Sequence, residues 1–247
     1  MEDFHALLVV DVERFSSHRD SDLPDLHLEI RAAVASAFEA SGLGEVWKAV
    51  RFLESTGDGL LAALPHRTLP ALIDPFPLWL QEALAQAAPR LRARGMRLRL
   101  RAALHVGLLD EERLDTPGIS TAVIDVNRLL DADPLRDALK NSDPDSTFTA
   151  FLLSEEVFTT YVRGGRTELR ASRFTEVRVK VKQFDRPAHL YVPVPSRIET
   201  PAEAAPAASP PVRRPGGTPA GGVTINGDRN QNVFGNEIGG DFRMGRP

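Results

Sequence analysis

The chain has 247 residues, of which 42% are hydrophobic, and a formal net charge of −4 at pH 7. This composition suffices for one globular domain of roughly 150–200 residues with a tail, and the acidic balance argues against binding to nucleic acid. The lack of cysteine excludes disulfides, thiolate catalysis and cysteine zinc sites. Because the sequence shows neither a secretory leader nor an apolar run that could span a bilayer, we expect a cytoplasmic protein without membrane association.

The first predicted strand covers residues 5–12 and is almost continuously apolar, which is typical of a central strand buried on both faces. The chain then turns at Phe15 to Ser17. Apolar residues recur every four positions between Pro24 and Gly42, so residues 24–41 are predicted to form an amphipathic helix that covers one face of a sheet.

Residues 46–64 are predicted to form a β-hairpin, because apolar segments flank the dipeptide Asp58-Gly59. Asp-Gly is a strong signal for a two-residue turn in which both residues take positive φ. The carboxylate of Asp58 is therefore expected at an exposed tip.

A second helical region is predicted from Thr68 to Leu91, interrupted at Pro75 and Pro77 and kinked or ended at Pro89. Because Pro lacks a backbone N–H, each of these residues weakens a continuous helix.

Residues 96–107 alternate apolar and polar, which predicts a half-exposed strand. Its polar face carries Arg97, Arg99, Arg101 and His105. We interpret the row of three arginines as a solvated sheet face and His105 as a surface or core residue. The elements up to this strand follow the order β-α-β-β-α-β, which is the ferredoxin-like order.

The remainder of the domain is predicted as short helices and strands. Ser120 can cap a helix, and Asp133-Pro134 can start a second one. The other predicted elements are a strand at 148–153, a helix at 154–162 and two closing strands at 175–182 and 188–193. The predicted fold class is α+β, with helices mostly on one face of a largely antiparallel sheet.

The last fifty residues differ in composition from the domain at 1–194. Residues 195–222 are rich in Pro, Ala and Gly and predict a disordered linker. The tail at 223–247 repeats the pattern Ile-x-Gly-Asp, at Ile225 and again at Ile238. Two interpretations remain open for it, namely a disordered polar segment or a short β element that orders against a protein partner.

Two carboxylates occupy the ends of predicted strands, Asp11 and Asp58. Such a pair suits a hard divalent cation, because Mg²⁺ and similar ions prefer oxygen ligands and often carry phosphates. The alternative is that each Asp merely belongs to a turn.

Several motifs resemble class III nucleotidyl cyclase homology domains. The segment VVDVERFSS is similar to their Asp-x-x-x-Phe-Ser/Thr signature, and ESTGDGLLAALP is similar to their Gly-Asp-Gly hairpin. RAALHVG resembles the following strand, and VKVKQFDRPAHLYVPV resembles the late Lys segment and the closing strand. The resemblance covers residues 5–193.

The resemblance implies a ferredoxin-like cyclase core and conversion of a nucleoside triphosphate to a 3′,5′-cyclic mononucleotide in bacterial signalling or defence. It implies a head-to-tail homodimer with composite sites, and Mg²⁺ or Mn²⁺ as the cofactor. It assigns metal binding to Asp11, Asp58 and the carbonyl of Val12. It places the backbone amides of Phe15, Ser16 and Ser17 near phosphate, Glu54 at a guanine base and Lys182 at the triphosphate. Glu54 and Lys182 have a plainer interpretation as solvent-facing strand residues.

The sequence departs from the family on the helix that follows Ser120. The family places an Asn four residues before an Arg, to orient ribose and stabilise transition-state charge. Here Arg128 has Ile124 at that spacing, and Asn127 precedes Asp131 by four residues. Arg128 and Asn127 are the candidate catalytic residues with Lys182. The altered spacing leaves open an alternative, a domain that binds nucleotide and metal or scaffolds a partner without turnover.

Overall fold

The computed structural model describes residues 3–50, 53–55, 57–110 and 120–198. The predicted tail and nearly all of the predicted linker lie outside these residues. No helix in the described part of the chain is long and apolar enough to cross a membrane.

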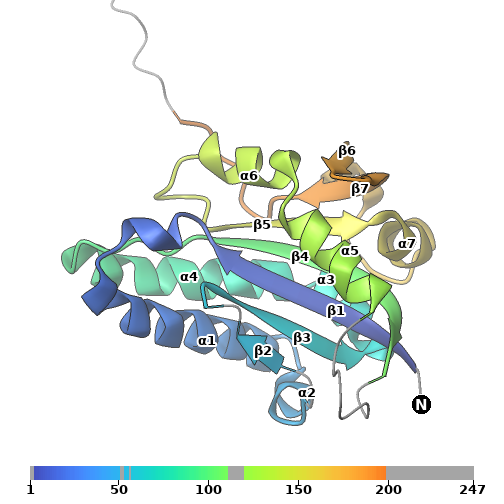
Figure 1. Cartoon of the computed structure of the whole chain (residues 1–247), viewed down its shortest axis with the longest axis horizontal. Helices are drawn as coiled ribbons and strands as arrows, with labels where there is room; N and C mark the ends of the chain where they lie inside the picture. The colour runs from blue at the N-terminus through green and yellow to red at the C-terminus, as the bar shows by residue number, and fades with distance from the viewer. Residues whose placement is uncertain (1–2, 51–52, 56, 111–119, 199–247) are drawn as a thin grey trace, which may run out of the picture. The chain divides into compact units, whose positions relative to one another are not determined.

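A single mixed sheet organises the described residues (Figure 1). Its strands lie in the order β2-β3-β1-β4-β5-β7-β6, and every neighbouring pair is antiparallel except β4 and β5. The strands are β1 (Asp3–Val12), β2 (Leu53–Ser55), β3 (Gly59–Pro65), β4 (Leu100–Leu109), β5 (Thr149–Ser154), β6 (Thr175–Val181) and β7 (Phe184–Tyr191).

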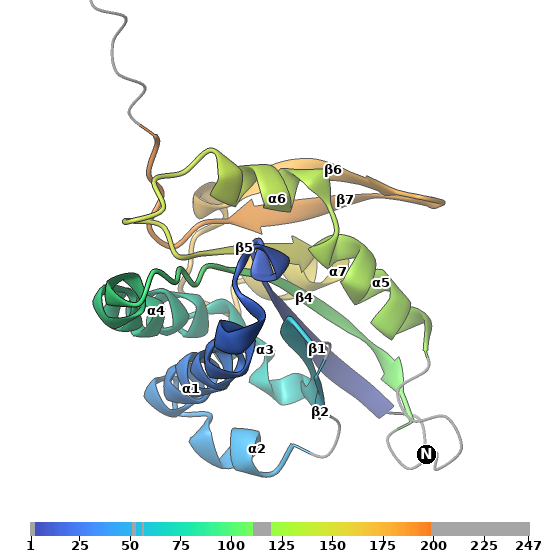
Figure 2. The same ribbon diagram turned by 60° about the vertical axis from the view of Figure 1, so that its left-hand side comes forward.

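Helices cover both faces of this sheet (Figure 2). The α1, α3 and α4 helices pack on one face, whereas α5 and α6 pack on the other. The helices are α1 (Leu23–Ala40), α2 (Gly44–Lys48), α3 (Leu69–Ile73), α4 (Phe76–Ala93), α5 (Thr121–Leu130), α6 (Asp133–Lys140) and α7 (Glu155–Val157), and a π-helical turn at Phe158–Arg163 follows α7. Most of the helices, including α2 and α7, pack on the face of α1 and α4, as predicted, while α5 and α6 add a second layer on the other face. The α+β class and the β-α-β-β-α-β order are confirmed.

The β1 strand is buried on both faces, as its apolar run predicted. Alternation along β1 sends Leu8 and Val10 into the core under α1 and α4, and sends Leu7 and Val9 into the core under α5 and α6. The next residue on the second face is Asp11, which explains how a carboxylate comes to lie beneath the α5 and α6 layer.

The α1 helix confirms the helix predicted at 24–41. Its four-residue repeat places Leu26, Ile30, Val34 and Phe38 in the core, and none of them is more than 1% exposed. The α5 helix begins as predicted, since the Ser120 hydroxyl accepts a hydrogen bond from the Val123 amide at 3.2 Å.

The predicted hairpin at 46–64 is only partly correct. The segment at Gly44–Lys48 is the α2 helix, and the ring of Trp47 stacks on Phe38 at a centroid distance of 4.6 Å. Because Ser55 pairs with Leu60, the turn spans four residues rather than two. The positive φ belongs to Gly57 at 89°, and Asp58 does not adopt it.

Further predictions near β4 need correction. The α4 helix does not end at Pro89 but continues to Ala93, and β4 begins at Leu100, so residues 96–99 are not part of the strand. The arginine row is fully solvated only at Arg97, because the exposed fraction of Arg99 is 7% and Arg101 is half-buried.

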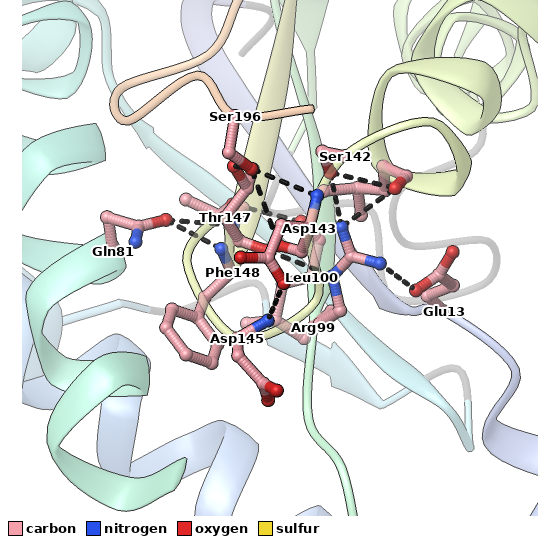
Figure 3. Close-up of polar contacts among 12 residues, drawn as sticks. Glu13, Gln81, Arg99, Leu100, Ser142, Asp143, Asp145, Thr147, Phe148 and Ser196 are labelled. Atoms are coloured by element: carbon pink, nitrogen blue, oxygen red, sulfur yellow. Dashed lines mark hydrogen bonds and ion pairs between the residues drawn. The ribbon is translucent and has the colours of Figure 1, made fainter. Parts of the chain in front are cut away.

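Arg99 joins three segments at one end of the sheet (Figure 3). Its guanidinium donates to Glu13 Oε2 at 3.0 Å, to the Thr147 carbonyl at 2.9 Å, and to the Leu139 carbonyl and Ser142 Oγ at 2.8 and 2.5 Å. Burial lowers the pKa of Arg99, and the neighbouring Glu13 carboxylate opposes that effect. These bonds fix the chain just after Asp11 against α6 and β5.

We predict that Arg99→Met destabilises the fold by about 3–5 kcal/mol, because it removes one partner of a largely buried ion pair and leaves the buried Thr147 carbonyl without its donor. The control is Arg97→Met. Arg97 is exposed, and no acidic side chain of the described residues lies within ion-pair distance of it, so we expect a change of at most about 0.5 kcal/mol. Urea unfolding with unchanged slope measures both values. Equal losses of unfolding free energy in the two variants would contradict the conclusion that the Arg99 hydrogen bonds hold these segments together.

Candidate active site

The sheet register brings Asp11 and Asp58 together. Asp11 of β1 pairs with Gly59, the first residue of β3, and the Val12 amide donates to the Asp58 carbonyl at 3.1 Å. The carboxylate of Asp58 is close enough to raise the pKa of Asp11. On the other side of β1, Asp11 pairs with Arg101 of β4, and the Arg101 Nη2 donates to Asp11 Oδ2.

The electrostatic environment of Asp11 is unfavourable for a lone carboxylate. Burial is the main cause that raises its pKa from 3.8 to about 6. The charge and hydrogen bond of Asp58 raise it further, whereas Arg101 lowers it. A divalent cation between the two carboxylates would relieve their repulsion.

The loop between β1 and α1 passes beside this pair. Arg14 adopts a left-handed conformation with φ of 58°, and Phe15–Ser17 form a single 3₁₀ turn. The Ser17 hydroxyl and amide both donate to the Arg14 carbonyl, at 2.7 and 3.0 Å. Within the described residues, the structure shows no protein acceptor for the amides of Phe15 and Ser16. These two amides can therefore donate to a ligand.

Basic side chains surround a small pocket next to Asp11. It has a volume of about 200 Å³ and is lined by Glu13, Arg14, Arg101, Arg136 and Lys140. The Nε of Arg101 is buried and has no hydrogen-bond partner among the described residues. An anion bound beside Asp11 would satisfy this donor.

The candidate catalytic residues on α5 make contacts within their own chain. Arg128 Nη1 donates to Asp125 at 3.1 Å, and its guanidinium lies 5.8 Å from the centre of the Phe184 ring. The side-chain Nδ2 of Asn127 donates to the Val123 carbonyl at 2.8 Å. No hydrogen bond or ion pair in the described part of the chain links Arg128 or Asn127 to Asp11.

The other two candidates are exposed. Lys182 lies at the tip of the β6–β7 hairpin with φ of 54°. Glu54 lies on β2, the edge strand, opposite Leu61. Neither residue makes a described contact with the Asp11 and Asp58 pair.

Comparison with known structures identifies the fold. A guanylyl cyclase, Cya2, superimposes with a TM-score of 0.54 at 13% identity, over 82% of this chain and 96% of that one. The adenylyl cyclase CyaB from P. aeruginosa gives a TM-score of 0.51 at 16% identity, over 80% and 98% of the two chains. An adenylate/guanylate cyclase/hydrolase from Silicibacter pomeroyi gives 0.52 at 23% identity, over 79% and 98%.

The described residues have the fold of a class III nucleotidyl cyclase domain. The resemblance inferred from the sequence motifs is confirmed at this level. No protein-family model and no curated protein matches the chain by sequence.

Within this cyclase fold, sequence reasoning missed the contribution of Arg101. The alternation at 96–107 placed Arg101 on a solvated face, but α5 and α6 cover that face and direct its guanidinium to Asp11. The sequence does contain a sign that this face is covered. Ala103, an apolar residue, lies on the same face of the strand as Arg101, opposite the face of Leu100. Recognising it required knowing that a second helical layer covers the sheet.

The chain's residues at this site fit a divalent metal. The donors are the two carboxylates and the nearby Val12 carbonyl, all hard oxygen ligands. Within the described residues, no group of three or more His, Cys, Asp or Glu side chains forms a metal site. A metal would therefore need further ligands from water or from phosphate, which Mg²⁺ commonly uses.

We predict that Asp58→Asn stabilises the metal-free protein above pH 6 and has little effect at pH 4. The folded pKa of Asp11 lies above its ordinary value, so the stability that this group contributes at low pH is lost as the pH rises through about 6. The Asp58→Asn substitution removes the charge of Asp58, which lowers the pKa of Asp11 and restores part of the stability lost above pH 6. Thermal melts at pH 7.5 should rise by about 2–4 °C for each kcal/mol recovered.

Asp137→Asn on the exposed surface of α6 is the matched control for this experiment. We expect it to give the same melting temperature as the wild type at both pH values. A destabilised Asp58→Asn variant at pH 7.5 would show that the two carboxylates do not repel one another.

Proposed function

We propose that the protein is a divalent-metal-dependent nucleotidyl cyclase that acts in bacterial signalling or defence. Its substrate is a nucleoside triphosphate, and its products are a 3′,5′-cyclic mononucleotide and pyrophosphate. The 3′-oxygen forms a bond to the α-phosphorus, and the bond from that phosphorus to the β-phosphate oxygen breaks. The observation that carries the proposal is the placement of Asp11 and Asp58 at adjoining strand ends of a cyclase fold, where the Val12 amide donates to the Asp58 carbonyl.

The chain offers several groups for a triphosphate near these carboxylates. The unpartnered Nε of Arg101 and the amides of Phe15 and Ser16 are donors that phosphate oxygens can accept from. A bound divalent cation would activate the ribose hydroxyl and neutralise phosphate charge. Asp11 and Asp58 would hold that cation, with the Val12 carbonyl and Ser17 beside it.

A head-to-tail homodimer is part of the proposal. Arg128, Asn127 and Lys182 make no described contact with Asp11, so we assign them to the site of the other protomer. In a symmetric dimer, α5 and the β6–β7 hairpin of one protomer can complete the site of the other. Lys182 would then meet the triphosphate as a point charge, and Glu54 would contact the base.

One observation favours a second candidate, a domain that binds nucleotide and metal without turnover. The helix that should supply an Asn and an Arg four residues apart has Ile124 at the Asn position, and 48% of Ile124 is exposed. Arg128 and Asn127 are bonded to Asp125 and Val123 of the same helix. A site that lacks these donors could retain binding and lose catalysis.

Incubation of the purified protein with each of the four nucleoside triphosphates and Mn²⁺ tests both candidates. We expect a cyclic product from at least one of them, and a loss of more than about 100-fold in Asp11→Ala and Asp58→Ala, because the metal supplies several kcal/mol of transition-state stabilisation. Asp137→Ala is the control and should retain activity.

Absence of product from all four nucleotides would contradict the cyclase proposal. If the wild type is then stabilised by nucleotide and Asp11→Ala is not, the binding module is supported. If neither is stabilised, both candidates are wrong.

A further inference from the structure

A larger basic pocket lies beneath the loop between β1 and α1. Its volume is about 580 Å³, within the range of small-molecule sites. The polar residues that line it are Glu13, Arg14, Ser17, His18, Arg92, Arg97, Arg99, Lys140 and Ser142. We propose that this pocket is a second anion site, which binds a small phosphate-bearing molecule independently of Asp11 and Asp58.

The charge of the pocket is not balanced by the protein. Arg92 pairs with Asp145 at 2.6 Å, and Arg99 pairs with Glu13 at 3.0 Å. For Arg14, Arg97 and Lys140, in contrast, no acidic side chain of the described residues lies within ion-pair distance. Three cations therefore face one cavity, in a chain whose net charge is −4.

The three cations come from separate segments of the chain. Arg14 belongs to the loop after β1, Arg97 to the segment before β4, and Lys140 to the last turn of α6. Two acids near them are already engaged: Glu13 accepts from Arg99, and Asp143 accepts from the Asp145 amide at 2.9 Å and from Ser146 Oγ at 2.7 Å. Convergence of unpaired cations from three segments is the arrangement expected of an anion site rather than of a solvated face.

The walls of the pocket are held in place before any ligand binds. Arg99 forms part of the lining with four hydrogen bonds, and the loop at Arg14 is closed by the Ser17 hydroxyl. Gly95, at φ of 75°, fixes the turn that carries Arg97. Such preorganisation reduces the entropy lost on binding.

The chemistry of the lining selects a compact, multiply charged ligand. Guanidinium groups bind phosphate through paired N–H donors, and lysine adds a point charge. The apolar lining consists only of Met96, Pro144 and Ile198, with the main chain of Gly95, and offers no aromatic surface for a base. Pyrophosphate is therefore a suitable probe.

The pocket adjoins the candidate active site but does not include it. Neither Asp11 nor Asp58 lines it, whereas Glu13, Arg14 and Lys140 line both this pocket and the smaller one beside Asp11. Arg97 lines this pocket and not the smaller one, so metal-free binding of pyrophosphate that depends on Arg97 separates this inference from the proposed cyclase activity, which requires both carboxylates.

The test is calorimetric titration of pyrophosphate into the full chain, freed of metal, at low ionic strength. We expect saturable binding that weakens more than about tenfold in the double variant Arg97→Gln/Lys140→Gln, since two charged donors are lost. The control of matched charge is Arg67→Gln/Lys180→Gln, two exposed residues outside the pocket, and its affinity should stay within about twofold of the wild type. Asp11→Asn/Asp58→Asn should also retain binding.

Three results would overturn the inference. The first is no binding to the wild type, or equal weakening in both double variants. The second is loss of binding in Asp11→Asn/Asp58→Asn, which would assign pyrophosphate to the nucleotide site. The third is equally tight binding of citrate, which would show recognition of charge alone rather than of phosphate. Absence of cyclase turnover would leave the inference unaffected.

Discussion

The pairing of β1 with its two neighbours is the constraint on which the site depends. The register sets Asp11 opposite Gly59 on one side and opposite Arg101 on the other. A slip of one residue would turn Asp11 toward the core under α1 and α4, and its carboxylate would lose the hydrogen bond from Arg101. Asp11 itself opposes that slip, because its carboxylate would enter an apolar core without a partner. The position of Asp11 and the pairing of the strand thus constrain one another.

Charge is concentrated at this end of the sheet, and the protein uses two arrangements to accommodate it. Arg99 is surrounded by acceptors, which offset part of the cost of burying its charge and join the segments around it. For Asp11, burial and a second carboxylate raise the pKa, and Arg101 offsets only part of the effect. A buried group left in an unfavourable state is typical of functional sites, where a ligand supplies what the fold does not.

The sequence predicted those features that depend on local pattern and failed where tertiary contacts decide. The four-residue period of α1, the Ser120 cap and the strand end at Asp11 follow from neighbouring residues alone, and the motifs around Asp11 and Asp58 predicted the cyclase fold. The α2 helix could not be predicted, because its place depends on Trp47 stacking on Phe38. The roles of Arg99 and Arg101 depend on the layer of α5 and α6, which alternation along one strand does not reveal.

Binding of Mn²⁺ tests the central claim most directly, because it requires neither turnover nor a known base. The measurement is the electron paramagnetic resonance signal of free Mn²⁺ during titration with the protein and a nucleoside triphosphate. We expect the wild type to bind Mn²⁺ at pH 7.5 and to bind it more weakly below pH 6, as Asp11 takes up a proton. The variant Asp11→Asn/Asp58→Asn should bind no Mn²⁺ beyond the amount that the free nucleotide binds. Equal uptake by the wild type and this double variant would contradict the central claim.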